Sequence, residues 1–81
     1  MERNERADFT IEVGYDREAE VWVVEQSEVP GLTIEGDTYD QLITNIHDLA
    51  PVLLRANEVE RAATEVSLDI FSRYRDRVRI G

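Results

Sequence analysis

Carboxylates dominate the side chains that could do chemistry, because the chain has eighteen aspartates and glutamates but one histidine and no cysteine. Glu12 and Asp69 stand at polar positions of segments that alternate apolar and polar residues, so both could face the same side of a sheet. A metal-dependent nuclease needs several carboxylates that converge on hard ions such as magnesium. No further acid has a metal-ligand spacing, so we interpret both residues as solvated surface and expect no metal or other cofactor.

His47 is the other candidate for catalysis, since a histidine can act as a general base near neutral pH. No serine or cysteine accompanies it in a recognisable motif, and it falls at the edge of an apolar helical stripe. We therefore interpret His47 as a boundary residue of the helix. With no catalytic residue assigned, we expect the protein not to be an enzyme.

The distribution of charge narrows the class of partner. The 81 residues carry a formal net charge of −9. Residues 1–60 hold fifteen acids and four arginines, whereas residues 61–81 hold three acids and five arginines. A negative body repels phosphate, which argues against a nucleic-acid surface on residues 1–60 and favours basic proteins as partners.

The composition also indicates the cellular compartment of the protein. Without cysteine there are no disulfides and no cysteine-based metal sites, which fits a reducing cytosol. Residues 1–9 lack the apolar run of a signal peptide, and no apolar stretch approaches the roughly 20 residues that span a bilayer. We expect a cytoplasmic protein that does not associate with membranes.

Two strands are predicted in the first third of the chain. Residues 8–14 alternate, with Phe9, Ile11 and Val13 on one face and polar residues on the other, as in a half-buried strand. Residues 21–26 are apolar on both faces, so this second strand is either covered on both sides or available to a partner.

A turn, a third strand and a helix follow closely. Val29-Pro30-Gly31-Leu32 has the composition of a type II turn, in which the glycine takes the positive φ. Residues 32–35 then run back as a short strand, and Gly36 lets the chain turn again. Thr38-Tyr39-Asp40-Gln41 matches the capping box at the start of a helix that we expect over residues 39–57.

The last strand completes the order of elements. From Glu65 to Ile80 the period returns to two, with apolar residues on one parity and arginines on the other. Sixteen residues are long for one strand, so we expect it to break near Asp76 or to reach past its own sheet. The predicted fold class is α+β, with the order β-β-β-α-β and one helix on one face of a single mixed sheet.

The chain resembles the HicB-like antitoxin family, and within it the short single-domain branch described only as a domain of unknown function (DUF1902-type). Five segments carry the resemblance and lie in about half of the chain. They are Asp16–Val23, Val29–Leu32, Glu35–Thr38, Ala50–Leu54 and Asn57. The resemblance implies a reduced ribonuclease-H-like sheet and a single HicB-like domain over residues 8–81, after a flexible N-terminus of residues 1–7.

The resemblance also implies a role, which is to bind and silence a small basic mRNA-cleaving toxin by direct contact. Longer members of the family add a C-terminal DNA-binding domain, for which this chain has no room after Ile70, so we do not expect DNA binding. Members of the short branch need not have a toxin. The alternatives are therefore an orphan homodimeric module and, with less support, a ribonuclease-H-like nuclease.

The candidate partner-binding residues lie on the second and last predicted strands, and they are Trp22, Val24, Phe71, Arg73 and Arg75. One helix leaves one sheet face uncovered, so Trp22 and Val24 either line an interface there or are covered within the monomer. The arginines either form a solvated strand edge, pair with the acidic body of a second copy, or bind RNA phosphate. We expect a homodimer that uses one or both regions.

Overall fold

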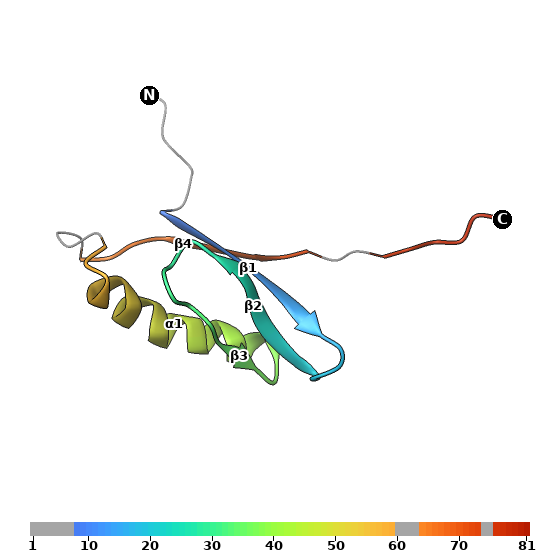
Figure 1. Ribbon diagram of the computed structural model, residues 1–81, viewed down its shortest axis with the longest axis horizontal. Coiled ribbons are helices and arrows are strands. Elements are labelled where there is room, and N and C mark those ends of the chain that lie inside the picture. The colour runs from blue at the N-terminus through green and yellow to red at the C-terminus, as the bar shows by residue number, and fades with distance from the viewer. Residues whose placement is uncertain (1–7, 60–63, 74–75) are drawn as a thin grey trace, which may run out of the picture.

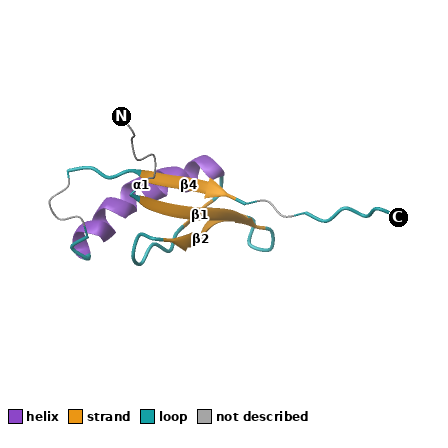
Figure 2. Cartoon of the chain, turned by 90° about the horizontal axis from the view of Figure 1, so that it is seen from above, coloured by secondary structure: helices purple, strands orange, loops and turns teal. Residues whose placement is uncertain are grey.

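A computed structural model describes residues 8–59, 64–73 and 76–81 of the chain. One four-stranded sheet is covered on one face by one helix, as Figures 1 and 2 show. The elements are β1 (Phe9–Asp16), β2 (Val21–Ser27), β3 (Glu35–Gly36), α1 (Tyr39–Ala56) and β4 (Leu68–Ser72). The predicted α+β class and the order β-β-β-α-β are confirmed. The flexible terminus predicted for residues 1–7 lies outside the described residues, and so does Arg75.

The sheet is mixed, with the strand order β3-β2-β1-β4. β2 runs antiparallel to both β1 and β3, whereas β4 returns through α1 and runs parallel to β1. A polar clamp fixes the start of this parallel pair, because Ser67 N donates to Asp8 Oδ2 at 2.9 Å and Asp8 N donates to Ser67 Oγ at 2.9 Å. The clamp sets the register in which Phe9 lies opposite Leu68.

The core lies between α1 and the sheet. Phe9, Ile11 and Val13 are buried, as their alternation predicted. The buried partners come from α1 and from the loop after β2, and they are Leu42, Ile46, Ala50, Leu54, Val29 and Leu32. Each fully buried side chain of this size contributes about 1.5–3 kcal/mol relative to its exposed state, so this layer holds the fold together. Within the described residues, no helix is long and apolar enough to cross a membrane.

The predicted turn before β3 is confirmed, although the strand that follows is shorter than expected. Gly31 has a φ of 75°, and Leu32 N donates to Val29 O at 3.3 Å, as in a type II turn. Leu32 then packs into the core instead of starting a strand. β3 is only Glu35–Gly36, so the predicted strand over residues 32–35 is wrong in both its length and its position.

The ends of α1 agree with the prediction in position and differ from it in detail. Thr38 caps the helix, since its Oγ1 accepts a hydrogen bond from Gln41 N at 3.0 Å. The Gln41 side chain does not close the capping box, because it donates to Asn45 Oδ1 at 3.0 Å instead. The helix ends at Ala56, one residue before the predicted end, and Asn57 caps it with a φ of −96°.

Candidate protein-interaction surfaces

Trp22 and Val24 lie on the α1 side of the sheet, so they do not line its uncovered face. The register sets Val24 opposite the buried Val13 and Trp22 opposite Tyr15. The Trp22 ring also packs edge-to-face against Tyr39 of α1, with the ring centroids 5.2 Å apart. These contacts cover Trp22 within the monomer, which was the other interpretation that the sequence left open.

We name the sheet face away from α1 the open face. Its members follow from the alternation of each strand and from the register. They are Thr10, Glu12, Gly14 and Asp16 of β1, Val21, Val23 and Gln26 of β2, Glu35 of β3, and Asp69 and Phe71 of β4. Phe71 is 40% exposed, and both valines are only half-buried. Apolar side chains are therefore accessible on a face that no helix covers.

Glu12 is the one buried acid among the described residues, although it lies on the open face. Its Oε2 is 3.5 Å from Nε of Arg73, which follows β4 directly. The arginine side chain is 63% exposed, so the ion pair is well solvated on one side and contributes at most about 1 kcal/mol. Arg73 neutralises the carboxylate that stands in the middle of the face.

Metal binding finds little support on this face. Asp69 pairs with Thr10, so it lies on the same side as Glu12, as their alternation predicted. Throughout the described part of the chain, however, no three histidine, aspartate or glutamate residues gather closely enough to hold a metal ion.

A β-bulge shapes the other half of the open face. The pairing of β1 with β2 jumps from Glu12–Gln26 to Val13–Val24, which leaves Glu25 as the extra residue. The Glu25 carboxylate occupies the space beside Gly14, with its Cδ 2.6 Å from the point where a Cβ of residue 14 would lie. The Glu25 carboxylate therefore lies over the sheet at Gly14, and a larger residue at position 14 would displace it. This arrangement was not among the expectations from the sequence.

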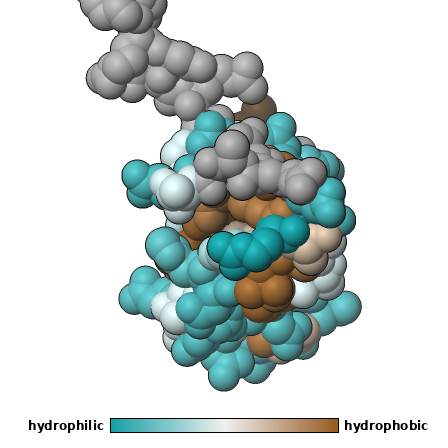
Figure 3. All heavy atoms as spheres, turned by 90° about the vertical axis from the view of Figure 1, so that its left-hand side faces the viewer, coloured by the Kyte–Doolittle hydropathy of each residue, from teal (hydrophilic) through white to brown (hydrophobic). Residues whose placement is uncertain are grey.

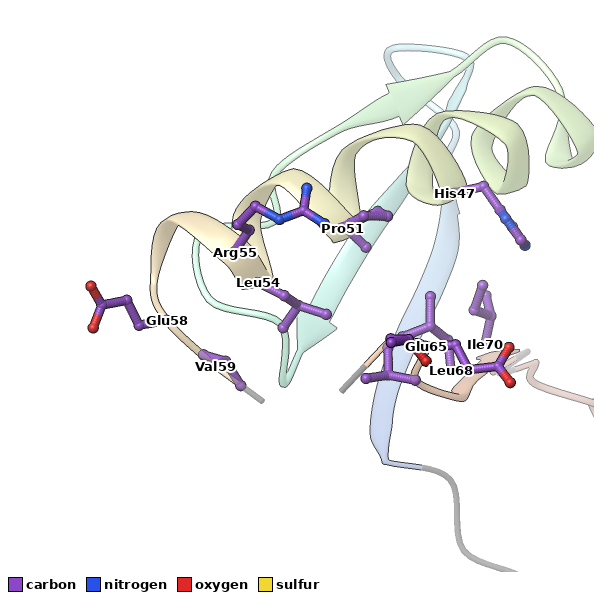
Figure 4. A pocket seen from close by; sticks show the side chains of 12 residues that line it. His47, Pro51, Leu54, Arg55, Glu58, Val59, Glu65, Leu68 and Ile70 are labelled. Atoms are coloured by element: carbon purple, nitrogen blue, oxygen red, sulfur yellow. The ribbon is translucent and has the colours of Figure 1, made fainter. Parts of the chain in front are cut away.

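A groove of about 690 Å³ lies on the other side of the sheet, between the C-terminal half of α1 and β4 (Figures 3 and 4). Leu68 and Ile70 form its floor, and Leu54 and His47 extend toward them from the helix. The remaining lining residues are Ala50, Pro51, Arg55, Glu58, Val59, Thr64, Glu65 and Val66. The groove is therefore apolar at its base and charged at its rim.

The position of α1 explains why the groove is there. The helix packs against β2 and β3, and Asn45 Nδ2 donates to Glu35 O at 2.8 Å, which ties α1 to that side of the sheet. β4 is the strand farthest from β3, at the opposite edge. One helix held over one half of the sheet leaves the other half partly uncovered.

A family model described as "Domain of unknown function (DUF1902)" matches residues 8–80. The chain belongs to the DUF1902 family. It is also similar to a solved structure, the hypothetical protein TTHA1013 from the extremely thermophilic bacterium Thermus thermophilus. The two sequences are 29% identical, the match covers 89% of this chain and 97% of that one, and the TM-score is 0.66. No curated protein matches the sequence.

The last described segment of this DUF1902 chain is residues 76–81, which we name the C-terminal arm. It has no helix or strand and projects away from the sheet (Figure 1). Val78 is 80% exposed and Ile80 is 95% exposed, more than any other large apolar residue that the structure describes. The alternating segment of residues 65–80 was expected to break near Asp76 or to reach past its own sheet. β4 spans only Leu68–Ser72, and the C-terminal arm lies beyond the sheet.

The candidate residues of the DUF1902 chain thus fall in different places. Trp22 and Val24 are on the α1 side, whereas Phe71 and Arg73 are together on the open face. His47 is exposed on α1 at the edge of the groove, the boundary position that its spacing predicted. Two surfaces remain accessible, the open face and the groove with the nearby edge of β4.

Proposed function

We propose that this DUF1902 protein is a small, non-catalytic, cytoplasmic binding module that neutralises a basic mRNA-cleaving toxin by direct contact, as its resemblance to HicB-like antitoxins implies. The observation that carries the proposal is the open face. Val21, Val23 and Phe71 are accessible there, and no helix among the described residues covers them. Accessible apolar residues with an aromatic member are typical of the centre of a protein interface.

The charges around this centre favour a basic partner. Glu25 and Asp69 are exposed on or beside the open face, and Glu35 follows on the neighbouring β3. A toxin that cleaves mRNA must be basic where it holds phosphate, so an acidic surface can occupy the same groove and exclude the RNA. Such complementarity acts mainly on the association rate, and at physiological salt it extends about 8 Å from each charge.

The test uses the short basic protein encoded nearest to this one. Association should slow at least tenfold between low and high salt, and the mixture should protect RNA from that basic protein. Glu25→Arg should slow association further, whereas Asp48→Arg makes the same charge change on the exposed side of α1 and should have a much smaller effect. If no basic neighbour binds even at low salt, the antitoxin proposal is wrong.

The non-catalytic part of the proposal has its own test. The purified protein should not cleave RNA in magnesium or manganese, because Glu12 is paired with Arg73 and stands in no metal-binding group of the described residues. Cleavage that disappears in Glu12→Gln or Asp69→Asn would instead support a nuclease of the ribonuclease-H-like kind.

A second candidate function is an orphan homodimeric module that has no toxin. The specific observation in its favour is the exposure of Val78 and Ile80, which an isolated chain leaves in water. Light scattering at high micromolar concentration should give the mass of a dimer. A monomer mass would contradict this self-association and leave the binding of a basic partner as a separate question.

A further inference from the structure

We infer that two copies form a symmetric dimer in which the C-terminal arm of each copy pairs with the outer edge of β4 in the other and fills its groove. The inference deepens the self-association proposed above and does not depend on a toxin. Its starting point is that β4 is an edge strand, and among the described residues nothing pairs with its outer side. Exposed edges of this kind bind extended segments by strand addition.

The arm does not reach the groove of its own copy. It leaves the sheet at the end of β4 and continues away from α1 (Figure 1). The groove lies between α1 and β4, where Leu68 and Ile70 line it. A return would need a tight reversal, and residues 72–80 contain neither glycine nor proline to favour one. The direction of the chain therefore allows the arm to fill the groove of a second copy but not the groove of its own copy.

Apolar residues and arginines alternate along the arm, and this alternation matches the groove on one side of β4 and the open face on the other. Val78 and Ile80 share one parity, and Arg77 and Arg79 share the other. As a strand next to β4, the arm would turn its apolar residues toward the apolar groove. Its arginines would then lie on the open face, which carries acids.

An antiparallel pairing about a two-fold axis just beyond the end of β4 gives both apolar residues of the arm an apolar partner on the groove side. Ile80 then lies opposite Leu68, and Val78 lies opposite Ile70. Both β4 residues are only half-buried in the monomer and line the groove. Directly opposed side chains have Cβ atoms about 4.5–5.5 Å apart, so these pairs would be in contact.

The same register gives favourable pairs on the open face. Arg79 lies opposite Asp69, a pair of opposite charges. Arg77 lies opposite Phe71, whose exposed ring can accept a guanidinium over its face. Because the axis relates the two copies, each contact occurs twice, as expected for an isologous interface.

One juxtaposition in this register is unfavourable. Arg73 is set against Arg75 of the second copy. Glu12 lies 3.5 Å from Arg73 and already neutralises it, so the repulsion is reduced. The two apolar pairs and the Asp69–Arg79 pair outweigh what remains, because they are repeated on both sides of the axis.

The first experiment measures the mass of the full chain by analytical ultracentrifugation. The wild type should be a dimer, and Val78→Asp combined with Ile80→Asp should weaken dimerisation at least about 100-fold, since four apolar side chains per dimer would be lost. Val52→Asp is the matched control, because Val52 is 56% exposed on α1 outside the groove, and it should leave the dimer intact. A wild-type monomer would overturn both the inference and the self-association on which it rests.

The second experiment tests the register and relies on the absence of cysteine from the chain. Asp69→Cys with Arg79→Cys should give a disulfide-linked dimer on a non-reducing gel, because opposed Cα atoms are about 4.5–5.5 Å apart, within disulfide range. Asp69→Cys with Arg77→Cys places the thiols diagonally, too far apart to be linked. An intramolecular disulfide, or equal linkage in both variants, would overturn the inference while the self-association still stands.

A charge exchange distinguishes variants that lose the dimer interface from variants that no longer fold. Asp69→Arg and Arg79→Asp should each weaken the dimer, and the two changes together should restore most of its affinity. Far-ultraviolet circular dichroism of each variant shows whether the monomer is folded. Additive weakening in folded variants would show that these residues do not meet.

Discussion

The two ends of α1 are packed in different ways. At one end, which we name the capped end, Thr38 caps the helix, Asn45 bonds to the backbone of β3, and Tyr39 packs on Trp22. At the other end, the groove end, the helix passes over half-buried Leu68 and Ile70 with a cavity between them. Polar contacts and close packing thus accumulate at one end, and accessible apolar surface accumulates at the other.

This difference in packing suggests that the capped end contributes mainly to stability and the groove end mainly to interaction with a partner. The capped end is held within the monomer by hydrogen bonds and ring contacts, so changes there should lower the free energy of unfolding. The groove end is incomplete within the monomer, so changes there should alter assembly more than folding. Predictions about substitutions at the two ends therefore test whether this division holds.

Gly36→Ala should have the largest effect on stability, because the capped end has no space for the added methyl group. A Cβ at this position would lie 2.5 Å from Leu42 N and 2.9 Å from Leu42 Cα, and the helix backbone cannot yield as a flexible side chain would. We expect the free energy of unfolding to fall by about 3 kcal/mol in a urea titration, at the upper end of overpacking costs.

The control for this substitution is Gly81→Ala, since a Cβ there meets nothing within 4 Å. It should leave the urea midpoint unchanged. A loss below about 1 kcal/mol for Gly36→Ala would mean that β3 and α1 can separate at little cost, which would contradict tight packing at the capped end. Gly36 was expected only to let the chain turn, and its close approach to Leu42 was not expected from the sequence.

Gly31→Ala should have an intermediate effect with a different cause. The nearest neighbour of an added Cβ is Leu53 Cδ2 at 3.8 Å, which is an ordinary contact. The cost comes from the φ of 75°, which alanine adopts poorly, and we expect a loss of about 1 kcal/mol in the same titration. Gly31→Asn should lose less, because asparagine tolerates this conformation better. Equal losses for both would point to packing rather than to φ.

Local patterns made much of the fold predictable. The alternation around Ile11, the turn at Gly31 and the cap at Thr38 each depend on a few neighbouring residues, and all three are confirmed. The DUF1902 branch of the resemblance is also borne out by the family match over residues 8–80. The antitoxin role and the homodimer stay predictions.

The sequence left questions open where the outcome depends on distant contacts. A strand that is apolar on both faces does not reveal which face meets the helix, so the position of Trp22 and Val24 was left open. Only the pairing of Val24 with the buried Val13 shows that this side of the strand faces α1. The bulge left no signal either, because residues 21–24 are all apolar and show no alternation that an extra residue could interrupt. The groove left no local signal, because it depends on where α1 lies across the sheet.

The smallest effect should come from Asp8→Ala, which loosens the clamp between β1 and β4. The substitution removes the acceptor of Ser67 N at 2.9 Å and of Ser67 Oγ at 3.4 Å but keeps the bond from Asp8 N to Ser67 Oγ. Both lost bonds are exposed, so global stability should fall by only about 0.5 kcal/mol.

Hydrogen exchange should reveal where that small loss acts. If the groove end opens separately, as low-stability segments do, the amides of residues 67–70 should exchange faster in Asp8→Ala while those of residues 42–46 keep their protection. Asp48→Ala, an exposed change on α1, should alter neither set. Equal acceleration at both ends would show that the sheet and helix open as one unit. The contrast between the two ends of α1 would then describe only their packing and not their stability.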